Sequence, residues 1–302
     1  MKQFNKYKRC FTFGCSFTRY KWPTWADIIK QEIPETINYG KAGAGNLYIS
    51  NQLVEANFRY NFNKDDLVII MWSSVTREDR YRHKGWVTSG NITTQNNISA
   101  KFVYNWFDYR FYLMRDLGLI ELTRQYMKNG LADFQMWNMA SFEIDDMISN
   151  NLSDKMKDTN YDDIKQLYAP TLAAIKPDIL STVFDGVWPQ TPIRGISGNG
   201  QTADYHPTPA HHLEYISKCL PNHDITEKMK QFAKKFENKL SEFVGAKFVI
   251  SGNNGTSALH LACMALGIKF KDIVWTVPIT FAASANCALN CCLLYTSPSP
   301  RD

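Results

Sequence analysis

The chain has 302 residues, of which 44% are hydrophobic and 21% charged, so it is long enough for one large domain or two smaller ones. Its net charge of +5 is mild, and its basic residues form no run of five or more, which argues against nucleic-acid binding. The sequence contains no membrane-spanning apolar run, no signal peptide and no metal-ligand spacing among its seven cysteines. We therefore expect a cytoplasmic protein without a membrane, nucleic-acid or metal partner.

Predicted strands and helices alternate along the first half of the chain. Apolar runs predict strands at residues 10–13, 36–39, 66–72 and 133–137. Helices are expected from Ser16 through Ile29, from 47 to 59, and from 107 to 127. The nearly continuous apolar run at 66–72 is typical of a central parallel strand covered on both faces. This alternation predicts an α/β fold with a doubly wound, mostly parallel sheet.

The second half of the chain begins with polar segments. Residues 144–163 are rich in Asn and Asp and predict a surface excursion, and residues 193–202 predict a loop. The composition changes near Ala233, after which an amphipathic helix is expected at 234–243. A second α/β unit follows, with strands at 245–250 and 272–276 and helices at 254–266 and 281–289.

Three candidate site residues follow predicted strand ends: Ser16, Gly43 and Ser74. Ligand sites of doubly wound sheets lie beyond the carboxyl ends of the strands, so we expect the three on one rim. A serine nucleophile needs a base within hydrogen-bond reach and donors for the developing oxyanion. His206 is the candidate base, and Asp204 would orient its imidazole.

The oxyanion donors expected from the sequence are the amides of Ser16 and Gly43 and the hydroxyl of Ser74. Ser16, at the start of a helix, would also gain the local positive potential of its free amides. Arg77 is a weaker candidate for binding an anionic substrate group, and the alternative is that it belongs to a solvated surface pair with Arg80.

Short blocks in this order resemble those of the SGNH (GDSL-like) hydrolases over residues 8–232. Gly14-Cys15-Ser16 resembles their first block, residues 38–43 the second, whose last glycine is an oxyanion donor, and residues 204–207 the last, which carries acid and base. The resemblance implies a flavodoxin-like three-layer sandwich and a cofactor-free esterase acting on a small-molecule or carbohydrate ester. A carbohydrate O-acyl ester is the specific hypothesis.

Three departures from the family pattern leave alternatives open. Cys15 replaces the usual aspartate, and Ser74 stands where the third block has an asparagine donor. One residue rather than two separates Asp204 from His206, which leaves a Ser-His dyad possible. A non-catalytic SGNH-like binding module is a further alternative.

Residues 233–291 resemble the opening part of the DegT/StrS family of PLP-dependent sugar aminotransferases, especially those of pseudaminic-acid synthesis. The resemblance implies that Thr256 and Ser257 match the residues that hold the cofactor phosphate, and that Phe281 matches the one that stacks on the pyridine ring. The family's ring-nitrogen aspartate and Schiff-base lysine have no match before the chain ends, so we expect this part to be inactive. The alternative function is a truncated nucleotide-sugar aminotransferase with an unrelated leader.

The last residues, 292–302, resemble translated sequencing-library adapter, as in an assembled metagenomic sequence. The expected organisation is therefore an SGNH-like domain at 1–232, an aminotransferase segment at 233–291 and a disordered tail at 292–302. The junction near Ala233 is either a true gene fusion or an assembly chimera. The sequence does not indicate an oligomeric state.

Overall fold

A computed structural model describes residues 4–92, 98–142, 161–186, 188–189, 191–194, 201–244, 259, 262–263 and 265–268. The chain divides into two compact units. The first comprises Met1–Val187 and Pro207–Lys239, and the second comprises Trp188–His206 and Leu240–Asp302.

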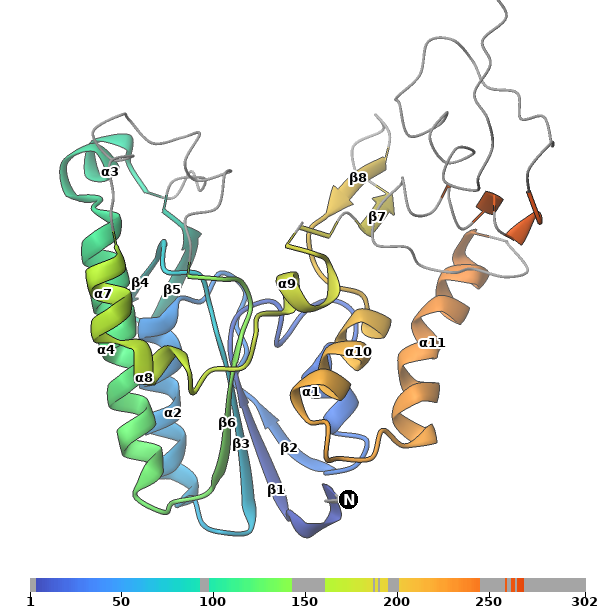
Figure 1. Cartoon of the computed structure of the whole chain (residues 1–302), viewed down its shortest axis with the longest axis horizontal. Helices are drawn as coiled ribbons and strands as arrows, with labels where there is room; N and C mark the ends of the chain where they lie inside the picture. Colours follow the sequence, from blue (N-terminus) through green and yellow to red (C-terminus); the bar gives the residue numbers. More distant parts are fainter. Residues whose placement is uncertain are drawn as a thin grey trace, which may run out of the picture. The chain divides into compact units, whose positions relative to one another are not determined.

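A four-stranded parallel sheet is the centre of the first unit (Figure 1). Its strands are β1 (Arg9–Phe13), β2 (Glu35–Asn38), β3 (Asp66–Trp72) and β6 (Asp133–Asn138), in the order β2-β1-β3-β6. All seven residues of β3 are buried, as predicted for a central strand covered on both faces. The predicted α/β class with a parallel sheet is confirmed.

Helices cover both faces of this sheet (Figure 1). On one side, α2 (Asn46–Tyr60) packs against α4 (Tyr109–Lys128); on the other, α1 (Trp25–Ile29) packs against α10 (Pro209–Cys219). The shorter helices are η1 (Phe4–Lys6), α3 (Ala100–Trp106), α7 (Asp162–Leu167), α8 (Ala169–Leu172) and α9 (Ile179–Val183). Large side chains fill the layers between helices and sheet, among them the fully buried Trp25, Trp72, Trp137, Tyr215, Phe11 and Phe13. Burial of such side chains is the main stabilising contribution to the fold.

The prediction of a helix that begins at Ser16 is wrong. After β1 the chain makes one turn, in which the amides of Thr18 and Arg19 both donate to the Cys15 carbonyl oxygen, at 3.0 and 3.2 Å. Helix α1 begins only at Trp25. Pro23 explains the delay, because a proline disfavours helical backbone in the residue before it.

Two antiparallel hairpins were not predicted. The first joins β4 (Arg77–Arg82) to β5 (Gly85–Asn91), and the second joins β7 (Thr191–Arg194) to β8 (Gln201–Asp204). The loop expected at 193–202 is therefore wrong at both ends, which pair as strands. The first hairpin is rich in charge and the second in Gly, Ser and Thr, so neither shows an apolar alternation.

Helix α11 (Glu227–Val244) continues without a break through Ala233, where the composition changes. Met229 and Ala233, one helical turn apart, are both buried. The domain boundary at 232/233 stays a prediction. The helix expected at 254–266 is observed at residues 259, 262–263 and 265, while the strands expected at 245–250 and 272–276 and the helix expected at 281–289 lie outside the described residues.

Several other predictions also fall outside the described residues: those on Thr256, Ser257 and Phe281, on residues 292–302, and on most of 144–163. Within the described part of the chain, no helix combines the length and the apolar character that a membrane crossing requires.

Candidate functional site

Ser16 lies in a tight turn directly after β1, and its exposed fraction is only 7%. The turn depends on Gly14, whose φ is +156°. A side chain at Gly14 would collide with the Thr18 hydroxyl and approach the Met71 carbonyl oxygen to 3.0 Å. Glycine is therefore required two residues before the candidate nucleophile, for both conformation and space.

Gly43 lies in the loop after β2, with a φ of +73°. A Cβ atom there would come within 2.6 Å of the Thr88 carbonyl oxygen. The loop is held against β5 because the Gly90 amide donates to the Gly43 carbonyl oxygen at 3.0 Å and the Thr88 hydroxyl donates to the Ala42 carbonyl oxygen at 2.7 Å. The hairpin thus fixes the loop that carries the predicted oxyanion donor.

Ser74 follows β3, and its hydroxyl oxygen accepts a hydrogen bond of 3.3 Å from Arg77 Nε. The same guanidinium donates to the Ala44 carbonyl oxygen at 2.9 Å and contacts Met139 Sδ at 3.5 Å. Arg77 therefore ties the loop after β3 to the loop after β2. These contacts indicate that Arg77 holds the two loops of the rim together, rather than binding substrate as predicted.

The loops that follow β1 and β2 are also joined directly, because the Lys41 amide donates to the Gly14 carbonyl oxygen at 3.1 Å. The structure therefore places the loops that carry Ser16, Gly43 and Ser74 together on one rim of the sheet, as predicted. Cys15 points into the core, where its thiol donates to Met139 Sδ at 3.2 Å. Cys15, which stands where SGNH hydrolases have an aspartate, thus contributes to core packing in this chain.

Asp204 and His206 form a close pair at the end of β8, in the second unit. His206 Nδ1 lies 2.6 Å from Asp204 Oδ1, and the His206 amide donates to the same oxygen at 3.1 Å. The single intervening residue thus allows the acid to reach the imidazole. A carboxylate at Nδ1 favours the tautomer with its proton on Nδ1, which leaves the Nε2 lone pair as a base. Ser16 belongs to the first unit, so its pairing with His206 stays a prediction.

Sequence reasoning missed a buried polar cluster beside the rim, centred on Asn46. Asn46 Nδ2 donates to the Ser73 carbonyl oxygen at 3.0 Å, and the Ser73 amide donates to Asn46 Oδ1 at 2.8 Å. Asn46 Nδ2 also donates to Asp116 Oδ2 at 2.8 Å. Asn46 and Asp116 are fully buried, so these hydrogen bonds are shielded from water. They fix the backbone next to Ser74.

Asp116 is fully buried, and its carboxylate accepts hydrogen bonds from two donors, Arg115 Nε and Asn46 Nδ2. Burial raises its pKa to about 6, although the Arg115 guanidinium at 2.6 Å and the Asn46 amide act in the opposite direction. An aspartate beside an arginine usually has a lowered pKa, so desolvation is the stronger effect at this site.

Asp79 anchors the start of α2 from the hairpin. Its carboxylate accepts hydrogen bonds from the amides of Gly45 and Tyr48, both at 2.9 Å. A carboxylate at a helix N-terminus satisfies free amides and interacts favourably with the helix dipole. Burial nevertheless raises the pKa of Asp79, and the two amides only partly offset this effect. No spacing in the sequence links Asp79 to a helix that begins 33 residues earlier.

The described residues contain no group of three His, Cys, Asp or Glu side chains that could hold a metal ion. The residues predicted to match a PLP site, Thr256, Ser257 and Phe281, lie outside the described part of the chain.

Comparison with known proteins gives a family match for the C-terminal part of the chain. Residues 209–294 match the DegT/DnrJ/EryC1/StrS aminotransferase family. A transaminase for UDP-4-amino-4,6-dideoxy-N-acetyl-beta-L-altrosamine from Campylobacter jejuni is 47% identical over 77 residues, which are 26% of this chain and 20% of the relative. GDP-perosamine synthase from Escherichia coli O157:H7 is 38% identical over 87 residues, 29% of this chain and 22% of the relative. The chain thus spans about a fifth of these relatives, and the predicted resemblance to this family is confirmed for this segment.

Two solved structures of lipolytic enzymes resemble the chain at low similarity. A member of the lipolytic G-D-S-L family from Veillonella parvula covers 70% of this chain and 96% of its own, with 15% identity and a TM-score of 0.38. The psychrotrophic esterase EstA from Pseudoalteromonas sp. covers 79% of this chain and 99% of its own, with 8% identity and a TM-score of 0.29. The first of these two neighbours belongs to the G-D-S-L family, and catalytic activity of this chain remains a proposal.

Proposed function

We propose that the chain is a serine-dependent ester hydrolase of the SGNH type, with Ser16 as nucleophile, His206 as base and Asp204 as the residue that orients His206. The observation that carries this proposal is the 2.6 Å contact between Asp204 Oδ1 and His206 Nδ1, which favours the tautomer with its proton on Nδ1 and so makes Nε2 the basic nitrogen. A carboxylate-imidazole pair is the activating half of a serine triad.

The reaction would proceed by acyl transfer. Ser16 Oγ attacks the ester carbonyl carbon while His206 Nε2 takes its proton, and the carbonyl oxygen becomes an oxyanion. The amides of Ser16 and Gly43 and the hydroxyl of Ser74 would donate to this oxyanion. The alcohol leaves with the proton from His206, and water, activated by the same imidazole, then releases the acid and restores Ser16.

A hydrogen bond within the first unit supports the pairing of Ser16 with His206. Trp22 Nε1 donates to the Pro207 carbonyl oxygen at 2.8 Å. Trp22 belongs to the loop that follows Ser16, and Pro207 is covalently bonded to His206. The chain next to the candidate base is thereby held to the loop next to the candidate nucleophile.

A fluorophosphonate probe tests the nucleophile directly, because it labels an activated serine irrespective of the natural substrate. We expect the full chain to gain one adduct on Ser16 and to hydrolyse acyl-p-nitrophenyl esters. Ser16→Ala and His206→Ala should abolish both, whereas Ser217→Ala, which removes an exposed serine of α10, should change neither. Labelling that survives Ser16→Ala would refute the mechanism.

A carbohydrate O-acyl ester is the proposed substrate class, suggested by the sugar aminotransferases that residues 209–294 resemble. Release of acetate from acetylated sugars tests it.

The match over residues 209–294 favours a second candidate function, PLP-dependent aminotransfer to a nucleotide sugar. Sequencing of the source locus beyond residue 291 tests it: a reading frame that continues to a Schiff-base lysine supports an aminotransferase, and a stop or a switch to unrelated sequence excludes it.

The third candidate is a non-catalytic SGNH-like binding module. It rests on Ser74 in place of an asparagine and requires that the fluorophosphonate leave Ser16 unlabelled.

A further inference from the structure

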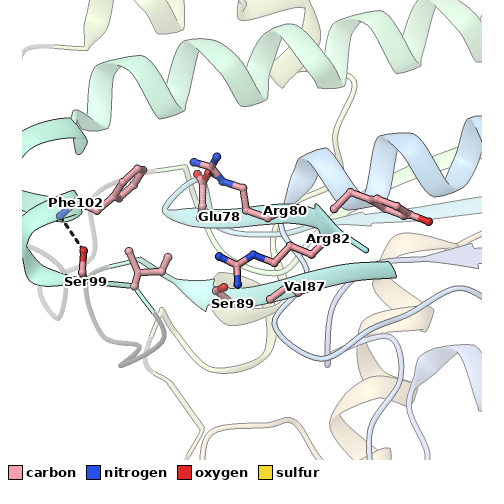
Figure 2. A pocket seen from close by; sticks show the side chains of 9 residues that line it. Glu78, Arg80, Arg82, Val87, Ser89, Ser99 and Phe102 are labelled. Carbon is pink, nitrogen blue, oxygen red and sulfur yellow. Dashed lines mark hydrogen bonds and ion pairs between the residues drawn. The ribbon is translucent and has the colours of Figure 1, made fainter. Parts of the chain in front are cut away.

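The hairpin β4–β5 and the start of α3 line an open cavity of about 790 Å³, which none of the site residues above occupies. Figure 2 shows its side chains. Arg80 and Arg82 lie on β4, Val87 and Ser89 on β5, and Phe102 on α3. This volume lies within the range of pockets that hold small organic ligands.

Strand alternation separates this cavity from the rim of the sheet. On β5, Thr88 and Gly90 contact the loop that carries Gly43, while Val87 and Ser89 line the cavity. Successive side chains of a strand point to opposite faces. One face of the hairpin therefore supports the predicted oxyanion loop, and the other face is available for a different role.

The acidic side chain of the cavity, Glu78, is already paired with basic side chains. Glu78 accepts hydrogen bonds from Arg80 Nε at 2.7 Å and from the Tyr112 hydroxyl at 2.7 Å, and it forms an ion pair with Arg115 at 3.4 Å. Arg82, in contrast, makes no hydrogen bond or ion pair within the described part of the chain. The positive charge of Arg82 is thus left without a counter-charge at the cavity.

The remaining lining supplies hydroxyl groups and an apolar wall. The Ser99 oxygen accepts a hydrogen bond from the Phe102 amide at 3.2 Å, which leaves its hydroxyl hydrogen available to a ligand. The Arg80 guanidinium lies 5.6 Å from the centre of the Phe102 ring. In Figure 2 the side chains of Arg80 and Arg82 both run along the hairpin towards the side where Phe102 lies.

We propose that this cavity binds a small organic anion, a phosphate or carboxylate group attached to a ring, with Arg82 on the anion and Phe102 and Val87 against the ring. A guanidinium matches the geometry of both anions because it donates two parallel hydrogen bonds. The serine hydroxyls add donors, and the uncompensated charge of Arg82 favours an anion over a neutral ligand. The proposal does not depend on ester hydrolysis.

Titration calorimetry of the full chain with phenyl phosphate, benzoate, inorganic phosphate and phenol tests this site. We expect phenyl phosphate or benzoate to bind saturably, more tightly than inorganic phosphate and phenol. Arg82→Gln should weaken that binding about tenfold to a hundredfold, since a charge-assisted hydrogen bond is lost. The matched control is Lys84→Gln, which removes an equal charge at the turn of the same hairpin, outside the cavity lining, and should leave the affinity unchanged.

A second variant separates the roles of ring and anion. Phe102→Ala should weaken the binding of phenyl phosphate more than the binding of inorganic phosphate. No saturable binding of either ringed anion would overturn the proposal, as would equal losses in Arg82→Gln and Lys84→Gln, because the second result reflects general charge. Equal affinity for phenyl phosphate and inorganic phosphate would overturn the assignment of the apolar wall. Circular dichroism of each variant establishes that a lost affinity is not a lost fold.

Discussion

Asn46 and Ser73 exchange two hydrogen bonds, in which the Asn46 side chain both donates to and accepts from the Ser73 backbone, at 3.0 and 2.8 Å. Ser73 is the first residue beyond β3, and these two hydrogen bonds take the place of those that a neighbouring strand would make with its backbone. It connects the start of α2 to the residue before Ser74, and Asp116 holds the same amide from α4.

Asn46→Ala should lower the free energy of unfolding by about 2 to 4 kcal/mol, because the buried backbone groups of Ser73 and the carboxylate of Asp116 lose their partner. Urea unfolding followed by tryptophan fluorescence measures this loss. Asn51→Ala on the same helix is the control. Among the described residues the exposed Asn51 side chain bonds only to the Leu47 carbonyl oxygen, so this variant should change stability by less than about 0.5 kcal/mol. Similar losses in both variants would contradict a special role for Asn46.

The stability of the protein should depend on the ionisation of Asp116. Its folded pKa of about 6 lies above the unfolded value of about 3.9, so the folded state binds more protons between these values. The contribution of Asp116 to stability therefore falls as the pH rises from about 4 to 6, by up to about 3 kcal/mol.

Urea unfolding of the natural chain and of Asp116→Asn between pH 4 and pH 7 measures this dependence. The stability advantage of the natural chain over the variant should shrink from about pH 4 to about pH 6 and stay level from there to pH 7. Asp65→Asn is a contrasting control, because the hydrogen bond from Lys8 lowers the pKa of this exposed carboxyl and gives its small contribution the opposite sign. A constant difference between the natural chain and Asp116→Asn would show that Asp116 is ionised throughout.

Gly14→Ala should destabilise the protein by about 2 kcal/mol or more and should abolish probe labelling of Ser16, because the added methyl group collides with Thr18 in a backbone conformation that favours glycine. In Gly118→Ala, within α4, the added methyl group meets, among the residues that the structure describes, only the Tyr168 hydroxyl at 3.6 Å, so this variant should instead stabilise by about 0.5 to 1 kcal/mol. Thermal unfolding and labelling of both variants provide the comparison. Normal labelling in Gly14→Ala would mean that the turn tolerates a side chain.

Asp204→Asn distinguishes a triad from a Ser-His dyad. If Asp204 orients His206 as proposed, the variant should lose about 10² to 10⁴ in kcat on p-nitrophenyl esters, since the amide no longer favours the required tautomer. Asp224→Asn, in the segment between α10 and α11, should retain the natural rate. A loss in Asp204→Asn of less than about threefold would favour the dyad.

The strands of the sheet could be predicted because burial on both faces leaves a local pattern. The run Asp66–Trp72 was predicted with the bounds that the structure has, and β1 and β6 differ by one residue at one end. The hairpin β4–β5 left no such pattern, because its sequence at Arg77–Arg82 is almost wholly charged. Its strands are stabilised by contacts with the loop of Gly43 and with α2, which lie 31 to 46 residues away in the chain.

The candidate site could be predicted only in part for the same reason. Ser16, Gly43 and Ser74 share a rim because parallel strands end on the same side, which follows from topology alone. Asn46 and Asp116 are separated by 70 residues, and their contact depends on the packing of two helices. A buried polar residue in a helix looks in sequence like any exposed one, so its role appears only in three dimensions.

The unbroken helix α11 limits how the two parts of this chain can have been joined. Met229 and Ala233 lie on one buried face, four residues apart, on either side of the predicted boundary. Each residue added to a helix rotates everything after it by about 100°. A fusion at this point therefore has to preserve helical phase, and insertion of a single alanine between Met229 and Ala233 would turn Ala233 about 100° away from the buried face that it shares with Met229.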